Sequence, residues 1–106
     1  MVNKIYSMIG IANRAGYLKV GETACVNAIK KNKAKIVLIA DDASFNTKKK
    51  FVNMCNSKNI AFKIFGKKDE IGYSIGKSSI SILAVCNNEF LNGFLKLFDG
   101  VSPENN

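Results

Sequence analysis

The sequence predicts an α/β protein, a three-layer α/β/α sandwich around a mixed central sheet of about four strands. Segments with apolar residues at helical spacing alternate with short, continuously apolar runs, in the order α-β-α-β-α-β-α-β-α. The chain has 106 residues, which is long enough for one domain and too short for two. We therefore expect a single domain over residues 1–100, followed by a flexible C-terminal tail at 101–106 that contains the only proline.

The N-terminal elements follow from apolar spacing. Residues 3–15 predict an amphipathic helix whose inward positions fall at i, i+3, i+4 and i+7: Ile5, Met8, Ile9 and Ala12. Residues 17–20, between two glycines, form a short strand or an extended link. The next helix runs from about residue 22 to residue 31 and has three apolar residues on one face: Cys25, Ala28 and Ile29. Residues 36–40 are continuously apolar, as in a strand covered on both faces.

A third helix begins near residue 44, where either Ser44 or Asn46 is a suitable N-cap. It carries apolar residues inward (Phe51, Met54 and Cys55) and lysines around its outside (Lys48, Lys49 and Lys50). Residues 61–65 predict the next strand. At least the second and third strands are expected to be parallel and joined by a right-handed crossover.

The C-terminal elements are a short helix, a strand and a long helix. Asp69 and Glu70 suit the positive N-terminal end of the short helix, which is expected to end at Gly76. Residues 80–86 form the last strand. Asn88 is expected to cap the final helix, which has its apolar residues at i, i+3, i+4 and i+7: Leu91, Phe94, Leu95 and Phe98.

The charge of the chain points to a polyanionic partner. Sixteen Lys and Arg against eight Asp and Glu give a net charge of +8. The lysines gather in three places: Lys30, Lys31, Lys33 and Lys35; Lys48, Lys49 and Lys50; and Lys67, Lys68 and Lys77. Lysines that neutralise phosphates give affinity and salt dependence but little sequence choice. A solvated lysine face is the alternative interpretation.

Aromatic residues for base stacking are scarce. Tyr6, Tyr17 and Tyr73 are the only candidates, because the seven phenylalanines are interpreted as core residues. A sheet that stacks the bases of a single strand is therefore disfavoured.

Catalytic chemistry has little support. Histidine is absent, so the commonest general base and metal ligand is missing. Residues 72–78 resemble a phosphate-binding P-loop, but the segment is one residue short between its glycines and follows a helix instead of preceding one. Asp41 and Asp42 are interpreted as turn residues, because adjacent side chains on an extended chain point in opposite directions. We expect no enzyme activity, no cofactor, no metal site and no small-molecule substrate.

The cysteines and the apolar runs indicate a compartment. Cys25, Cys55 and Cys86 are odd in number and form no C-x-x-C, which argues against disulfides and a zinc site. We interpret them as buried free thiols in a reducing cytoplasm. Because the N-terminus lacks a signal-peptide pattern and no apolar run is long enough to span a membrane, we expect a soluble, cytoplasmic monomer with no membrane partner.

Four segments carry a resemblance to a known family: residues 12–22 (Ala-Asn-Arg-Ala-Gly-Tyr-Leu-Lys-Val-Gly-Glu), 33–44 (Lys-Ala-Lys-Ile-Val-Leu-Ile-Ala-Asp-Asp-Ala-Ser), 46–50 (Asn-Thr-Lys-Lys-Lys) and 70–77 (Glu-Ile-Gly-Tyr-Ser-Ile-Gly-Lys). In order and spacing the chain resembles the YlxQ-type bacterial ribosomal-protein-like family, within the L7Ae/L30e superfamily of kink-turn RNA binders. The resemblance covers about residues 3–98. It implies an α/β/α sandwich, binding to structured RNA and no catalysis.

The resemblance also implies where RNA would bind: at the start of the second helix with the loop before it, and at the loop before the last strand. The implied RNA-binding residues are Lys19, Gly21, Glu22, Thr23, Asn27, Lys30, Lys31, Lys77, Ser78 and Ser79. Kink-turn binders of the superfamily carry Asn-Glu-x-x-Lys at the positions that Thr23, Ala24 and Asn27 occupy here. This chain therefore lacks the carboxylate and the cation of that motif, and Glu22 offers a carboxylate two positions earlier.

We predict non-catalytic binding of structured RNA, either a kink-turn or ribosomal RNA. The alternative function is a protein-interaction adaptor on the same fold with little specific RNA readout. The adaptor hypothesis requires an apolar surface patch, and it predicts that Lys48, Lys49 and Lys50 are dispensable.

Overall fold

The computed structural model describes residues 2–100, so the expected tail at 101–106 lies outside the described residues. The elements are α1 (Val2–Arg14), β1 (Leu18–Val20), α2 (Glu22–Lys30), β2 (Ile36–Ile39), α3 (Phe45–Lys58), β3 (Ala61–Ile64), α4 (Lys68–Ser74), β4 (Ile82–Val85) and α5 (Asn88–Gly100). Their order is the predicted one, and the segment left open between a strand and a link is a strand.

The four strands form one mixed sheet in the order β1-β4-β2-β3. β2 and β3 are parallel, with Ile36 opposite Ala61, which confirms the expected parallel pair. β4 runs antiparallel to both of its neighbours, and its residue Val85 lies opposite Leu18 of β1 and Ile36 of β2. The two central strands, β2 and β4, are buried along their whole length, as the continuous apolar runs predicted.

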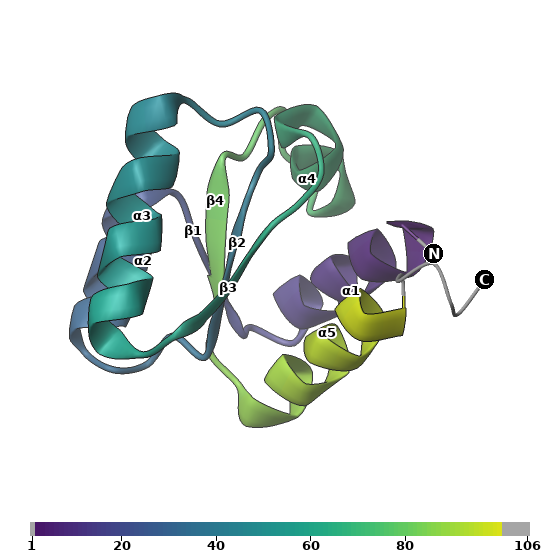
Figure 1. Cartoon of the computed structure of the whole chain (residues 1–106). Coiled ribbons are helices and arrows are strands. Elements are labelled where there is room, and N and C mark those ends of the chain that lie inside the picture. The colour runs from purple at the N-terminus through teal and green to yellow at the C-terminus, as the bar shows by residue number, and fades with distance from the viewer. Residues whose placement is uncertain (1, 101–106) are drawn as a thin grey trace.

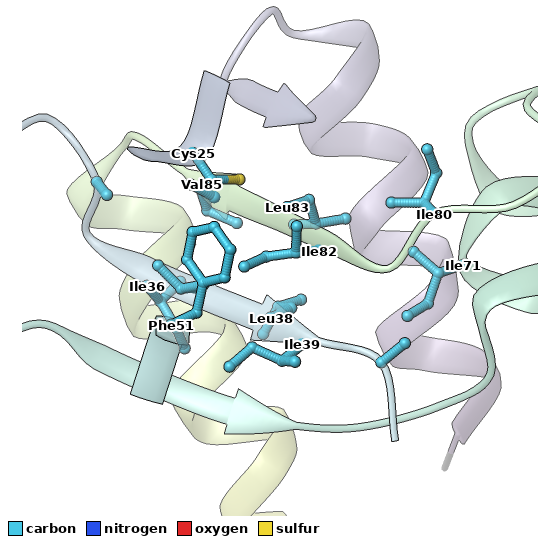
Figure 2. Close-up of a cluster of buried hydrophobic side chains, with 14 of the residues drawn as sticks. Cys25, Ile36, Leu38, Ile39, Phe51, Ile71, Ile80, Ile82, Leu83 and Val85 are labelled. Atoms are coloured by element: carbon cyan, nitrogen blue, oxygen red, sulfur yellow. The ribbon is translucent and has the colours of Figure 1, made fainter. Parts of the chain in front are cut away.

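Helices cover both faces of the sheet, which gives the expected three layers. α2 and α3 lie on one face, α1 and α5 lie on the other, and α4 sits near one end of the sheet (Figure 1). The core between these layers is formed by strand residues and the inward helix stripes. Figure 2 shows part of it, with Cys25 of α2 and Phe51 of α3 beside side chains of β2 and β4.

The helix ends show which capping predictions are right. Ser44 is the N-cap of α3, because its Oγ accepts a hydrogen bond from the backbone N–H of Thr47 at 3.2 Å. At α5 the prediction of Asn88 is wrong by one residue. Asn87 Oδ1 accepts from the Phe90 N–H at 2.9 Å, and Asn88 is already the first residue of the helix.

The ends of α4 also differ in detail from the prediction. The helix ends at Ser74, two residues before the predicted Gly76, which instead adopts a positive φ of 73° just beyond the helix. At the other end, Asp42 Oδ1 accepts from the Lys68 N–H at 2.8 Å. Asp42 is thus more than a turn residue, because its carboxylate accepts a hydrogen bond from the first free amide of α4.

Two burial expectations are wrong. Phe45 is 75% exposed, although all seven phenylalanines were expected in the core. The buried stripe of α3 consists of Thr47, Phe51 and Cys55, and Phe45 at the first helical position lies off this stripe. Cys86 is half-buried, whereas Cys25 and Cys55 are buried.

Burial also sets the thiol chemistry. It raises the pKa of Cys25 to about 12 and that of Cys55 to about 11. Burial likewise raises the pKa of Cys86, although nearby lysines act in the opposite direction. Across the part of the chain that the structure describes, no helix is long and apolar enough to cross a membrane.

Candidate nucleic-acid interface

The two segments that the resemblance assigned to RNA binding lie at the same end of the sheet. The Gly21 N–H, just after β1, donates to the Ile82 carbonyl at 3.1 Å. The Ala40 N–H, just after β2, donates to the Ser81 carbonyl at 2.8 Å. Backbone hydrogen bonds therefore hold the β1–α2 turn and the loop that leads into β4 at the same end of the sheet.

Gly21 gives α2 an open N-terminus. It is the N-cap, with φ 93° and ψ 164°, a conformation that is essentially restricted to glycine. A Cβ at this position would meet no atom within 4 Å. Glycine is therefore favoured here by the backbone conformation and not by lack of space. Because the cap has no side chain, the first amides of α2 receive no side-chain acceptor and can bind an anion.

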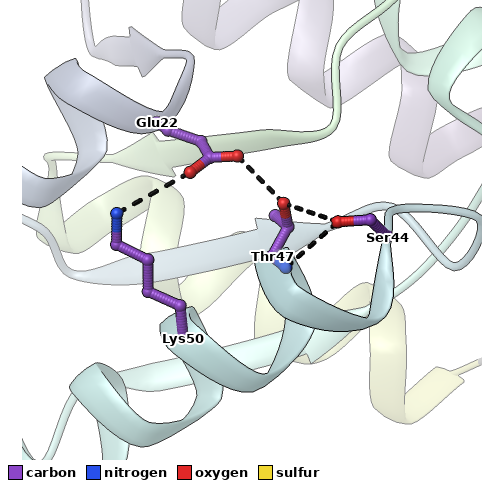
Figure 3. Close-up of polar contacts among 4 residues, drawn as sticks. All are labelled: Glu22, Ser44, Thr47 and Lys50. Atoms are coloured by element: carbon purple, nitrogen blue, oxygen red, sulfur yellow. Dashed lines mark hydrogen bonds and ion pairs between the residues drawn. The ribbon is translucent and has the colours of Figure 1, made fainter.

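Glu22 is tied to α3 by a chain of polar contacts (Figure 3). Ser44 Oγ donates to Thr47 Oγ1 at 3.0 Å, and Thr47 Oγ1 donates to Glu22 Oε2 at 2.9 Å. Lys50 Nζ lies 3.7 Å from the second carboxylate oxygen. The carboxylate at the start of α2 is therefore held in one direction, and a contact between Glu22 and RNA stays a prediction.

A basic hollow lies along the exposed side of α2. It has a volume of about 250 Å³ and is lined by Lys19, Ala24, Asn27, Ala28, Lys31 and Lys33. Four of these residues recur at i, i+3, i+4 and i+7 of the helix, and the two alanines leave room between the longer side chains. Three lysines and no carboxylate line it, so the hollow attracts phosphate groups.

The structure thus divides the predicted site residues into groups. Lys19, Asn27 and Lys31 come together in the basic hollow, while Gly21, Glu22 and Thr23 form the turn at the start of α2. Lys33 belongs to the hollow but was left out of the predicted set. Its place in the lysine cluster after the second predicted helix was the signal for it. Lys30 is exposed but does not line the hollow.

The predicted loop contacts, Lys77, Ser78 and Ser79, are all exposed. The loop is fixed against α4, because the Lys77 N–H donates to the Gly72 carbonyl at 2.8 Å. A Cβ on Gly72 would lie 2.8 Å from the Ser79 nitrogen. Gly72, in the P-loop-like segment, therefore allows close packing between α4 and this loop. The segment follows a helix and precedes a strand, which is the order that argued against a phosphate-binding loop.

Phe45 is a further candidate that the sequence interpretation missed. Its ring is exposed at the first residue of α3, next to the Ser44 N-cap. The signal was available from helical phase, since Phe45 precedes the buried Phe51 by six residues and so lies about 120° away from it around the helix. An exposed aromatic ring at this point offers a stacking surface for a base.

The site chemistry is that of anion binding. Among the residues described, no group of three His, Cys, Asp or Glu side chains is arranged to hold a metal ion. The lysines and the open amides of α2 are donors for phosphate oxygens.

Comparison with known proteins assigns the family. Residues 3–94 match the model of the ribosomal protein L7Ae/L30e/S12e/Gadd45 family. The chain belongs to this family. Two family relatives are named RNA-binding protein YlxQ. The one from Bacillus subtilis (strain 168) is 35% identical over 94 residues, covering 89% of this chain and 94% of that protein. The one from Enterococcus faecium is 37% identical over 98 residues, covering 92% and 93%.

Solved structures share the family fold. A protein with unknown function from Bacillus halodurans C has a TM-score of 0.87 at 32% identity, covering 91% of this chain and 97% of that one. The Giardia lamblia 15.5kD RNA binding protein has a TM-score of 0.77 over 95% of this chain and 90% of its own. Its identity of 14% supports the fold alone. The expected family and its α/β/α sandwich are thereby confirmed.

Proposed function

We propose that this protein binds structured RNA without catalysing a reaction on it. The RNA face consists of the basic hollow, the β1–α2 turn and the loop at residues 77–79. The observation that carries the proposal is the convergence of three lysines, with no carboxylate, on one hollow along α2, the helix whose N-terminal amides have no side-chain cap. The names of the two YlxQ relatives support it.

The physical basis of binding is phosphate neutralisation. Lys19, Lys31 and Lys33 converge on one hollow, so they can neutralise phosphates that lie close together, as in a bent or folded backbone. The amides at the start of α2 add donors that need no side chain. Because these groups are held by helix and sheet, the face favours RNA whose phosphates already have a matching shape.

The finer proposal is a preference for kink-turn or ribosomal RNA, which rests on the superfamily resemblance. Thr23, in the first turn of α2, and Asn27, in the basic hollow, offer hydrogen-bonding side chains to the groove of the RNA. Glu22 is oriented by Thr47 and Lys50 and can accept hydrogen bonds from guanine edges. We further propose that the protein acts as a cytoplasmic monomer that needs no cofactor.

The test compares a kink-turn duplex with a plain duplex of equal length over a salt series. We expect tighter binding of the kink-turn at every salt concentration and a linear fall of log affinity with log salt for both RNAs. Equal affinities would overturn the kink-turn preference and leave RNA binding standing. Absence of binding at low salt would overturn both.

A further inference from the structure

A second hollow is lined by residues of α1 and α4. α1 lies on the face of the sheet opposite α2 (Figure 1). This α1–α4 groove has a volume of about 710 Å³, within the range of sites that bind small molecules or short segments. The residues that matter for its chemistry are Gly10, Ile11, Arg14, Asp69, Glu70 and Tyr73. None of them belongs to the proposed RNA face.

The two helices that form the groove are fixed to each other. A Cβ on Gly10 would lie 3.0 Å from the Ser74 carbonyl oxygen, so the two backbones approach closely there. Tyr6 Oη donates to Glu70 Oε1 at 2.8 Å and accepts from the Lys67 N–H at 3.4 Å. The groove is therefore preformed, which reduces the entropy lost when a ligand binds.

The groove concentrates exposed apolar surface. Tyr73 is 86% exposed and Ile11 is 48% exposed, and both line the same hollow. Tyrosine contributes a large, stiff surface and is frequent among the residues that dominate protein interfaces. This is an apolar surface patch of the kind that the adaptor hypothesis required.

The charge of the groove is opposite to that of the chain. Two carboxylates, Asp69 and Glu70, and one cation, Arg14, line it, although the chain carries +8 overall. Both carboxylates lie on exposed residues. The groove thus disfavours the phosphates of RNA and favours a cationic ligand, in contrast to the three lysines of the basic hollow.

We propose that the α1–α4 groove binds a short cationic segment of a partner protein. An apolar side chain of that segment packs between Ile11 and Tyr73, and a lysine or arginine beside it pairs with Asp69 and Glu70. The Arg14 guanidinium donates to carbonyl groups of the segment. Since the groove and the RNA face share no residue, one molecule can hold RNA and the partner segment together.

The probes are two fluorescent peptides of about twelve residues. One contains Leu, Phe and Lys, and the other has the same order with Glu in place of Lys. Attraction to a chain of charge +8 favours the Glu peptide at any unspecific site. We expect the opposite order, with the Lys peptide binding about tenfold more tightly, because the groove presents two carboxylates beside exposed apolar side chains. Tighter binding of the Glu peptide, or no binding of the Lys peptide at about 1 mM, overturns the proposal.

Matched variants assign the peptide to the groove. Tyr73→Ala and Asp69→Asn should each weaken the Lys peptide by about tenfold. The controls Phe45→Ala and Glu89→Gln remove an exposed aromatic and an exposed carboxylate elsewhere, and they should change its affinity less than about twofold. Equal losses in the variants and the controls would contradict the assignment. Circular dichroism checks that Tyr73→Ala and Asp69→Asn fold, which we expect because Tyr73 and Asp69 are exposed.

Two further readouts separate other occupants of the groove. Sedimentation equilibrium of the wild type should show a monomer; a dimer that Tyr73→Ala dissociates would make a second copy the occupant and overturn the proposal. Kink-turn affinity of Tyr73→Ala should equal that of the wild type. A loss of RNA affinity in this variant alone would assign the groove to RNA and overturn the proposal. If no variant binds RNA, the proposed RNA-binding function is wrong and the groove proposal is unaffected.

Discussion

Replacing the three lysines of the basic hollow should remove most of the affinity for RNA. The variant combines Lys19→Ala, Lys31→Ala and Lys33→Ala, all at exposed positions of one hollow. Because exposed lysines contribute little to folding, we expect its free energy of unfolding to stay within about 0.5 kcal/mol per substitution of the wild-type value. The loss should therefore be one of binding.

The magnitude follows from counterion release. Each lysine that neutralises a phosphate of a duplex contributes about 0.9 to the slope of log affinity against log salt. Three such lysines contribute a slope of about 2.7. If the electrostatic contribution vanishes near 1 M salt, they account for about a 500-fold difference in affinity at about 0.1 M salt, or about 3.7 kcal/mol.

The assay is fluorescence anisotropy of a labelled kink-turn RNA over a salt series. A control variant with Lys4→Ala, Lys63→Ala and Lys96→Ala lowers the net charge by the same three units from α1, β3 and α5. We expect it to lose much less affinity and to keep the wild-type slope. Equal losses of slope in the two triple variants would show that only net charge matters, and would refute the assignment of phosphate contacts to the hollow.

Three predictions concern the fold. Gly21→Ala should lower stability by about 1–3 kcal/mol, seen as a fall of roughly 5–20 °C in Tm, because alanine is strained at φ 93° even without a clash; an unchanged Tm would contradict this. Phe51→Ala should lower the free energy of unfolding by about 3–5 kcal/mol, whereas Phe45→Ala should change it by less than about 0.5 kcal/mol. Equal losses in urea titrations would contradict the burial of Phe51 and the exposure of Phe45. Because burial keeps the Cys25 and Cys55 thiols protonated when unfolded thiols ionise, their contribution to the free energy of unfolding should be fully present below about pH 9 and should fall as the pH rises toward about 11. Cys55→Ala should weaken this pH dependence. A free energy of unfolding that rises between these pH values in the wild type would contradict the expected sign.

The layered fold could be predicted from the sequence because its signals are local. Helical spacing of apolar residues and two continuously apolar strands settle the order of elements before any long-range contact is considered. Non-local features were harder to predict. The segment at 18–20 is a strand only because it pairs with β4, more than sixty residues away, and three residues are too few to show a period.

The candidate site was predictable in part for the same reason. Asn27 lies in α2 and Lys31 is its C-cap, four positions later, so a helix predicted over residues 22–31 already places the two side chains next to each other. The hydrogen bond between Glu22 and Thr47 joins residues 25 positions apart and needs the packing of α2 against α3. The α1–α4 groove likewise joins residues near 10 and near 70, and no local pattern connects them.

The RNA face can be mapped most directly by titrating isotope-labelled protein with kink-turn RNA and following the amide chemical shifts. We expect the largest shift changes on the β1–α2 turn, the exposed side of α2 and the loop at residues 77–79. The lysines that line the basic hollow should be among the residues affected. Changes confined to α1 and α5, with the amides of residues 21–33 unaffected, would contradict this expectation.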